Sequence, residues 1–113
     1  MILVDTTPLV ALVDRRDGRH RLALSQLDQL RTNEFGTCEA VLVEACFHLP
    51  YREQRERLRA WLDRLDVKPL PDVDQVNLRE DVFSWILKYA DHQPDWADAC
   101  IAVLSGRDHS LEV

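Results

Sequence analysis

The sequence has little glycine and proline, few cysteines and no long apolar run. With 3 glycines and 5 prolines in 113 residues, it is neither a linker-like nor a collagen-like chain. Its uncharged stretches fall far short of the ~18 residues that a membrane span requires. The N-terminus lacks a basic segment and meets an acid at Asp5, so we expect no signal peptide and no membrane span.

The cysteines indicate the compartment in which the protein works, and the charge balance bears on whether it can bind nucleic acid. The chain has 3 cysteines and no CxxC pair, which favours small buried residues in a reducing compartment, the cytoplasm, over a disulfide or a zinc site. Asp and Glu number 20 against 14 Lys and Arg, a net charge of −6. Nucleic-acid-binding domains usually carry a basic footprint, so any contact with RNA requires that these acids first be neutralised.

Short apolar segments alternate with helical patterns, and we expect one domain over residues 1–113. Strands are predicted over 1–4, 34–37 and 67–70, with a further strand beginning at 110–113. A threonine of Thr6-Thr7 is expected to cap the first helix ahead of Pro8. The other helices are predicted over 18–31, 38–49, 51–65, 73–90 and 95–105, the last ending at Gly106. This alternation indicates a three-layer α/β/α sandwich with a mainly parallel sheet, whose site lies at the carboxyl ends of its strands.

Four acids stand out from the rest. Asp5 follows a buried strand and precedes a helix, where it would equally serve as a helix cap. Glu44 lies within an apolar helix, so it needs a cation, a donor or a proton; an arginine from a neighbouring helix is the structural alternative. Asp95 and Asp98 share one face of a helical first turn, where they suit the helix dipole but repel each other unless a cation lies between them.

Together these acids predict a metal site. Oxygen ligands without a His or Cys set favour Mg²⁺ or Mn²⁺, because hard cations bind carboxylates and water. Such a site at the edge of an α/β sheet is suited to phosphodiester hydrolysis, in which the metal polarises the phosphoryl group and activates water.

The sequence resembles the PIN-domain nucleases, the fold of the VapC-like toxins of toxin–antitoxin pairs. Three segments carry the resemblance, in family order and at family-like spacing: MILVDTTPLVALVD, GTCEAVLVEACFHL and YADHQPDWADACIAVLS. The resemblance covers the chain from residue 1 to its end. It implies a cytoplasmic endoribonuclease dependent on Mg²⁺ or Mn²⁺, with an antitoxin partner, an RNA substrate and a homodimeric state.

The resemblance also assigns roles to residues. It makes Asp5, Glu44 and Asp98 catalytic metal-site acids, with Asp95 as a further ligand. Thr6 would supply a hydroxyl beside the metal. The family pattern continues into a strand with a fourth acid, whereas this sequence stops at Leu111-Glu112-Val113, which indicates a truncated last strand.

That missing acid supports an alternative function, a PIN-like RNA- or protein-binding module with an incomplete, inactive metal site. A receiver domain of the response-regulator kind also has an acidic pocket at strand ends. It needs a lysine at a late strand end, and neither Lys68 nor Lys88 fits.

The predicted helix over 51–65 offers a partner surface. Arg52, Arg55 and Arg59 form one stripe, either solvated and paired with nearby glutamates or in contact with RNA phosphates or an acidic antitoxin. Trp61, Phe83 and Trp85 are interpreted as core or interface residues.

Overall fold

The computed structural model of the protein describes residues 1–71 and 74–107. Its strands are β1 (Ile2–Leu3), β2 (Phe35–Thr37) and β3 (Lys68–Pro69). Its helices are α1 (Thr6–Val13), α2 (His20–Leu30), α3 (Glu39–His48), α4 (Arg52–Arg64), α5 (Gln75–Lys88), the 3₁₀ turn η1 (Ala90–His92) and α6 (Trp96–Arg107). This order confirms the predicted succession of elements. The strand predicted at 110–113 lies outside the described residues.

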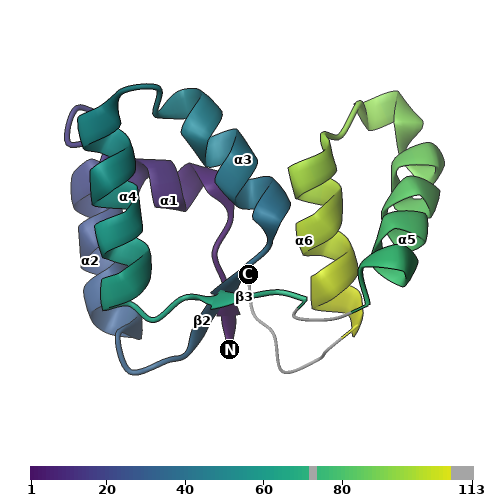
Figure 1. Cartoon of the computed structure of the whole chain (residues 1–113), viewed down its shortest axis with the longest axis horizontal. Coiled ribbons are helices and arrows are strands. Elements are labelled where there is room, and N and C mark those ends of the chain that lie inside the picture. Colours follow the sequence, from purple (N-terminus) through teal and green to yellow (C-terminus); the bar gives the residue numbers. More distant parts are fainter. Residues whose placement is uncertain (72–73, 108–113) are drawn as a thin grey trace.

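The strands form a parallel sheet in the order β1-β2-β3. Ile2 pairs with Phe35, and Gly36 pairs with Lys68. Helices α2 and α4 lie to one side of the strands and α5 and α6 to the other (Figure 1). The predicted α/β class with a parallel sheet is therefore confirmed, and Asp5 follows β1 at the carboxyl edge of the sheet.

Gly36, in the middle strand, is required by a close approach of side chains. A Cβ atom at this position would lie 2.6 Å from Cδ1 of Leu70 and 2.9 Å from Sδ of Met1. Both distances are shorter than a carbon contact allows, so a larger residue would displace these side chains. The glycine thus lets residues that flank the outer strands meet over β2.

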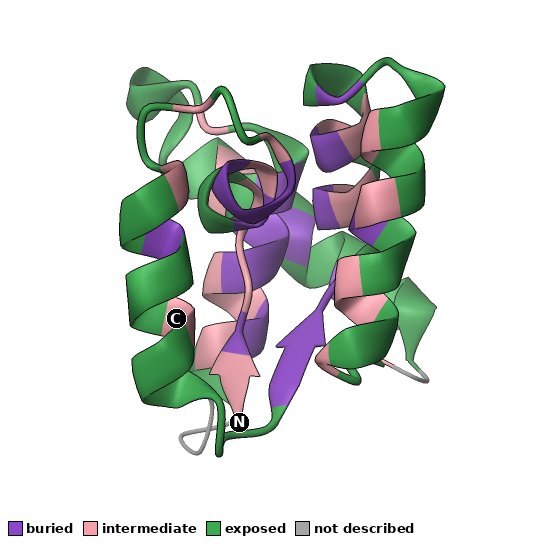
Figure 2. Ribbon diagram, turned by 90° about the vertical axis from the view of Figure 1, so that its left-hand side faces the viewer, coloured by how far each residue is buried: buried purple, intermediate pink, exposed green. Residues whose placement is uncertain are grey.

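The core lies between the strands and the inner faces of the helices, as the buried residues in Figure 2 show. The largest fully buried side chains are Leu3, Leu9, Val13, Val41, Leu49 and Val82. Trp61 and Trp85 pack against this core, as predicted, whereas Phe83 is half exposed and stacks edge-on against Trp96. Along the described chain, each helix is too short or too polar to cross a membrane.

The cysteines behave largely as predicted. All 3 are free thiols; Cys38 and Cys100 are buried, and Cys46 is partly buried. Burial of Cys38 and Cys100 fits their interpretation as small apolar residues.

The limits of two helices differ from the prediction. The cap of α1 is Asp5 and not a threonine: its Oδ1 atom accepts from the Thr6 backbone N–H at 2.7 Å. Helix α6 continues through Gly106 to Arg107. The Arg107 guanidinium lies 2.6 Å from Asp81 of α5 and 3.5 Å from Asp74, the residue before α5, and these ion pairs hold the last turn in place.

Candidate active site

Asp5 lies where β1 turns into α1. One carboxylate oxygen caps the helix, and the other makes no hydrogen bond with the described residues. The capping role and the predicted role at a site are therefore compatible, because capping occupies one oxygen.

Asp95 and Asp98 lie at the start of α6. Asp95 Oδ1 accepts from the Asp98 backbone N–H at 2.7 Å, the geometry of a helix cap. Both residues are exposed overall, but the carboxyl group of Asp98 is partly shielded from water. Asp95 and Asp98 thus share the first turn of the helix, as their spacing predicts. Asp95 caps the helix, whereas Asp98 is near other carboxylates.

The pKa of Asp98 shows which acids share its surroundings. Partial burial of the carboxyl group raises this pKa, and the negative charges of Asp95 and Asp5 raise it further. A carboxylate beside like charges is costly to ionise, and a bound cation would offset that cost. Asp98 therefore lies within electrostatic range of Asp5 and Asp95, two of the other three predicted acids.

Glu44 has a different immediate neighbour. Its Oε1 atom lies 3.3 Å from Nε2 of His48, one turn further along α3, and its side chain is 37% exposed. The expected partial burial is observed, but the partner is a histidine of the same helix and not an arginine from another. Helix α3 packs against both α1 and α6, so Glu44 lies on the helix between the two segments that carry the other acids.

The donors around Asp5 suit a hard divalent cation. The Thr6 hydroxyl is buried and lacks a hydrogen-bond partner among the described residues, so it is free to bind water beside an ion. Within residues 1–71 and 74–107, no three His, Cys, Asp or Glu side chains are arranged to hold a metal. Mg²⁺ needs only one or two carboxylates and keeps several waters, so Asp5 and Asp98 with an oxygen-only donor set fit this ion.

Thr37 is a positioning residue that the sequence alone did not reveal. It is 3% exposed at the carboxyl end of β2, and its hydroxyl donates to the Val4 carbonyl at 2.7 Å. This bond fixes the backbone at Val4, between β1 and Asp5. The available signal was a polar residue closing a strand whose other members are apolar.

Replacing Thr37 by Val is expected to lower the free energy of unfolding by about 1–2 kcal/mol, because the Val4 carbonyl loses its partner while the side-chain volume is kept. Urea denaturation measures the change. Thr32→Val, in the exposed turn before β2, should stay within about 0.5 kcal/mol. Equal stability of the two variants would contradict the role given to the Thr37 hydroxyl.

The arginine stripe of α4 has mixed surroundings. Arg52 pairs with Glu56 at 2.8 Å, as expected if the stripe is solvated and paired with nearby glutamates. Arg55 donates to the carbonyls of Leu49 and Cys46, at 3.0 and 2.9 Å, and so caps the end of α3. Arg59 is exposed and makes no ion pair with the described residues. Contact of this stripe with RNA or an antitoxin stays a prediction.

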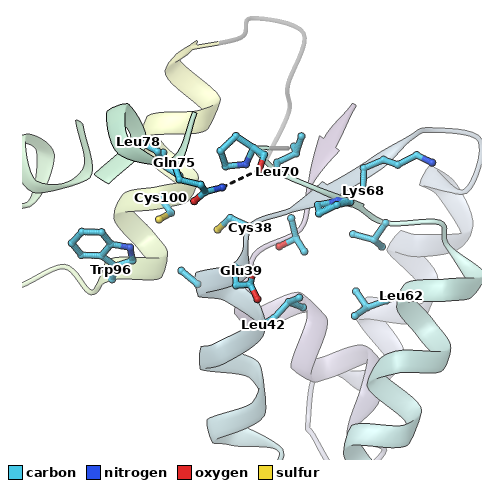
Figure 3. Close-up of a pocket in the computed structure, with 15 residues that line it drawn as sticks. Cys38, Glu39, Leu42, Leu62, Lys68, Leu70, Gln75, Leu78, Trp96 and Cys100 are labelled. Atoms are coloured by element: carbon cyan, nitrogen blue, oxygen red, sulfur yellow. Dashed lines mark hydrogen bonds between the residues drawn. The ribbon is translucent and has the colours of Figure 1, made fainter. Parts of the chain in front are cut away.

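A cavity of about 210 Å³ opens between β3, α3 and α6 (Figure 3). Cys38 and Cys100 face each other in its wall, and their thiols hydrogen-bond, which lowers the pKa of Cys38 to about 7 and raises that of Cys100. None of the four acids lines this cavity. It is thus separate from the acidic cluster.

Comparison of the sequence and the fold with known proteins identifies the family of this chain. The sequence matches the family model described as PIN domain over residues 2–111. Among solved structures, that of Mycobacterium tuberculosis VapC20, described as a Sarcin-Ricin loop cleaving toxin, superposes with a TM-score of 0.72 at 22% identity, covering 95% of this chain and 82% of that one. No curated protein matches the sequence. A family match over almost the whole length, on a fold shared with VapC20, shows that the chain belongs to the PIN domain family.

Proposed function

We propose that this protein is an endoribonuclease that depends on Mg²⁺ or Mn²⁺ and acts as the toxin of a toxin–antitoxin pair. The observation that carries the proposal is the placement of the acids: Asp5 follows β1 at the start of α1, Asp95 and Asp98 lie at the start of α6, and both helices pack against α3. Membership of the PIN domain family and the shared fold with an RNA-cleaving toxin support the same reading.

Each acid has a distinct part in this mechanism. Asp5 and Asp98 would hold the cation, with Asp95 and Glu44 as further carboxylates around it. When bound, such a cation polarises the scissile phosphoryl group and lowers the pKa of an attacking water. The Thr6 hydroxyl would orient water beside Asp5, because it has no partner among the described residues. The start of α6, with its positive dipole end, would face the negative charge that develops on the phosphate.

The proposal extends to partners and location. A toxin of this kind would pair with an antitoxin, form a homodimer and work in the cytoplasm. Exposed apolar side chains support protein partners: Val43 and Phe47 on α3 are 67% and 76% exposed, and Leu87 on α5 is 72% exposed. Val43 and Phe47 are four residues apart on α3 and so share a face, and neighbouring exposed apolar side chains are typical of protein contacts.

Metal dependence tests the proposal. RNA cleavage should require Mg²⁺ or Mn²⁺ and stop in EDTA. At about tenfold excess over its Kd, Mn²⁺ should raise the melting temperature by roughly 5 °C, because the ion binds the folded state and offsets the repulsion at Asp98. Asp98→Asn should lose this shift, whereas Asp28→Asn, on the exposed face of α2, should keep it.

Two results would contradict the proposal. Undiminished cleavage in EDTA would exclude a metal mechanism. A chain that binds Mn²⁺ but cleaves no RNA would instead be the inactive binding module that the sequence left as the alternative.

A further inference from the structure

A second charged site lies at the other end of α1, and its sign is opposite to that of the acidic cluster. A pocket of about 360 Å³ opens between the end of α1, the start of α2 and one face of α4. Its polar lining consists of Arg15, Arg57, Arg64 and His20, and none of the 20 acids lines it. In a chain with a net charge of −6, this is a local concentration of positive charge.

The three arginines of this basic pocket are not neutralised by carboxylates. None of them forms an ion pair with the described residues, in contrast to Arg19, Arg31, Arg52 and Arg107. Arg57 donates one hydrogen bond to the Val13 carbonyl, at 3.2 Å. Its other N–H donors remain available to a ligand. Unpaired guanidinium groups that share a pocket repel each other, and an anion between them would relieve that repulsion.

The geometry of the pocket suits a phosphodiester better than a small inorganic ion. The guanidinium of Arg64 lies 5.0 Å from the ring centre of Trp61, so charge and an aromatic surface occur side by side. Leu12, Leu24 and Ala60 add apolar wall. Arginine forks match the oxygens of phosphate groups, and apolar and aromatic walls accept sugar and base.

The distance along α1 from the basic pocket to the acidic cluster corresponds to a few nucleotides of RNA. Asp5 caps the start of α1, and Val13 ends it after 8 residues, a length of about 12 Å. A stacked strand rises by about 3.4 Å per nucleotide along its axis. A strand running beside α1 would therefore place roughly three to four nucleotides between the two ends.

We propose that the basic pocket binds phosphate groups of the RNA substrate, about three to four nucleotides from the bond that is cut. The inference rests on the proposed nuclease function. The basic pocket would attract RNA to a protein whose net charge is negative. It lies at the end of α1, the helix that Asp5 caps. The binding arginines are then Arg15 and Arg64, with Arg57 fixed by its bond to α1.

Equilibrium binding to a fluorescein-labelled single-stranded RNA of about 12 nucleotides tests this assignment. Fluorescence anisotropy in EDTA reports binding without cleavage, over a range of salt concentrations. The double variant Arg15→Gln/Arg64→Gln should bind about tenfold more weakly, and its salt slope should fall by about 1.4, the value for two lost phosphate contacts. Arg57 is left unchanged because it also caps α1.

Two control variants separate the pocket from net charge and from folding. Arg31→Gln/Arg79→Gln removes the same charge from exposed positions outside the pocket and should leave the salt slope unchanged. Arg15→Lys/Arg64→Lys keeps the charge and should retain most of the slope, although it loses the arginine fork. Melting curves of all variants show whether each remains folded.

Two results would contradict RNA binding at the basic pocket. Equal RNA affinity and slope for the Arg15→Gln/Arg64→Gln variant and the wild type would overturn the proposal. So would polyglutamate that binds the wild type more tightly than RNA and depends on the same arginines, because the pocket would then fit an acidic protein segment. Cleavage is scored separately with Mn²⁺, so failure of the nuclease function leaves the binding result readable.

Discussion

Asp5→Asn is expected to reduce RNA cleavage about a thousandfold, from the loss of about 4 kcal/mol of transition-state stabilisation that a metal ligand supports. Folding should be unaffected, because asparagine caps helices as well as aspartate does. The Oδ1 bond to the Thr6 N–H would persist, while the charge that faces Asp98 would be removed. The substitution thus separates the two roles of this side chain.

Single-turnover cleavage with Mn²⁺ measures the rate, and thermal unfolding in EDTA measures stability. Asp28→Asn makes the same charge change at an exposed ion pair on α2 and should cleave like the wild type. If Asp5→Asn retained full activity, Asp5 would be a helix cap alone, and the metal would have to be held by other acids.

Leu49→Ala is expected to lower the free energy of unfolding by about 3 kcal/mol. Leu49 is 0% exposed at the end of α3, and truncating it would leave a cavity that its neighbours fill only partly. Its backbone contacts, to Ala45 and to Arg55, would remain, so the loss reports side-chain packing. Urea denaturation measures it.

Leu22→Ala serves as the matched control, because Leu22 is 59% exposed on α2. It should change the free energy of unfolding by less than about 0.5 kcal/mol. Similar losses at the two leucines would show that this face of α2 is covered in solution, and would revise the core described above.

Much of the fold could be predicted because the local signals agree with the final packing. Residues 1–4 form an apolar run that ends at Asp5, and the structure places β1 there with the acid directly after it. Asp95 and Asp98 share a first turn by spacing alone, and both the turn and the cap are observed. Where one element determines its own geometry, the sequence was sufficient.

The errors occurred where a distant partner decides the outcome. Gly106 is a good helix stop by local rules, but α6 continues to Arg107, which pairs with Asp81 of α5 and with Asp74 just before it. Arg55 looked like one of three equivalent surface arginines, yet it caps α3 through the Leu49 and Cys46 carbonyls. The arginines of the basic pocket come from a loop and from α4, and no spacing rule joins Arg15 to Arg64.

The two helix caps at the acidic cluster also bear on how such a site would decay over evolutionary time. Asp5 and Asp95 each begin a helix, so selection for folding continues at these positions even when selection for activity ends. Descendants that lose catalysis should therefore retain Asn, Ser or Thr at both positions, because these residues also cap helices, and should rarely carry alanine. Asp98 donates its backbone N–H to a cap without providing one, and it would be free to change to any helix-forming residue. In a lineage of this kind, change at Asp98 would mark the loss of catalysis first.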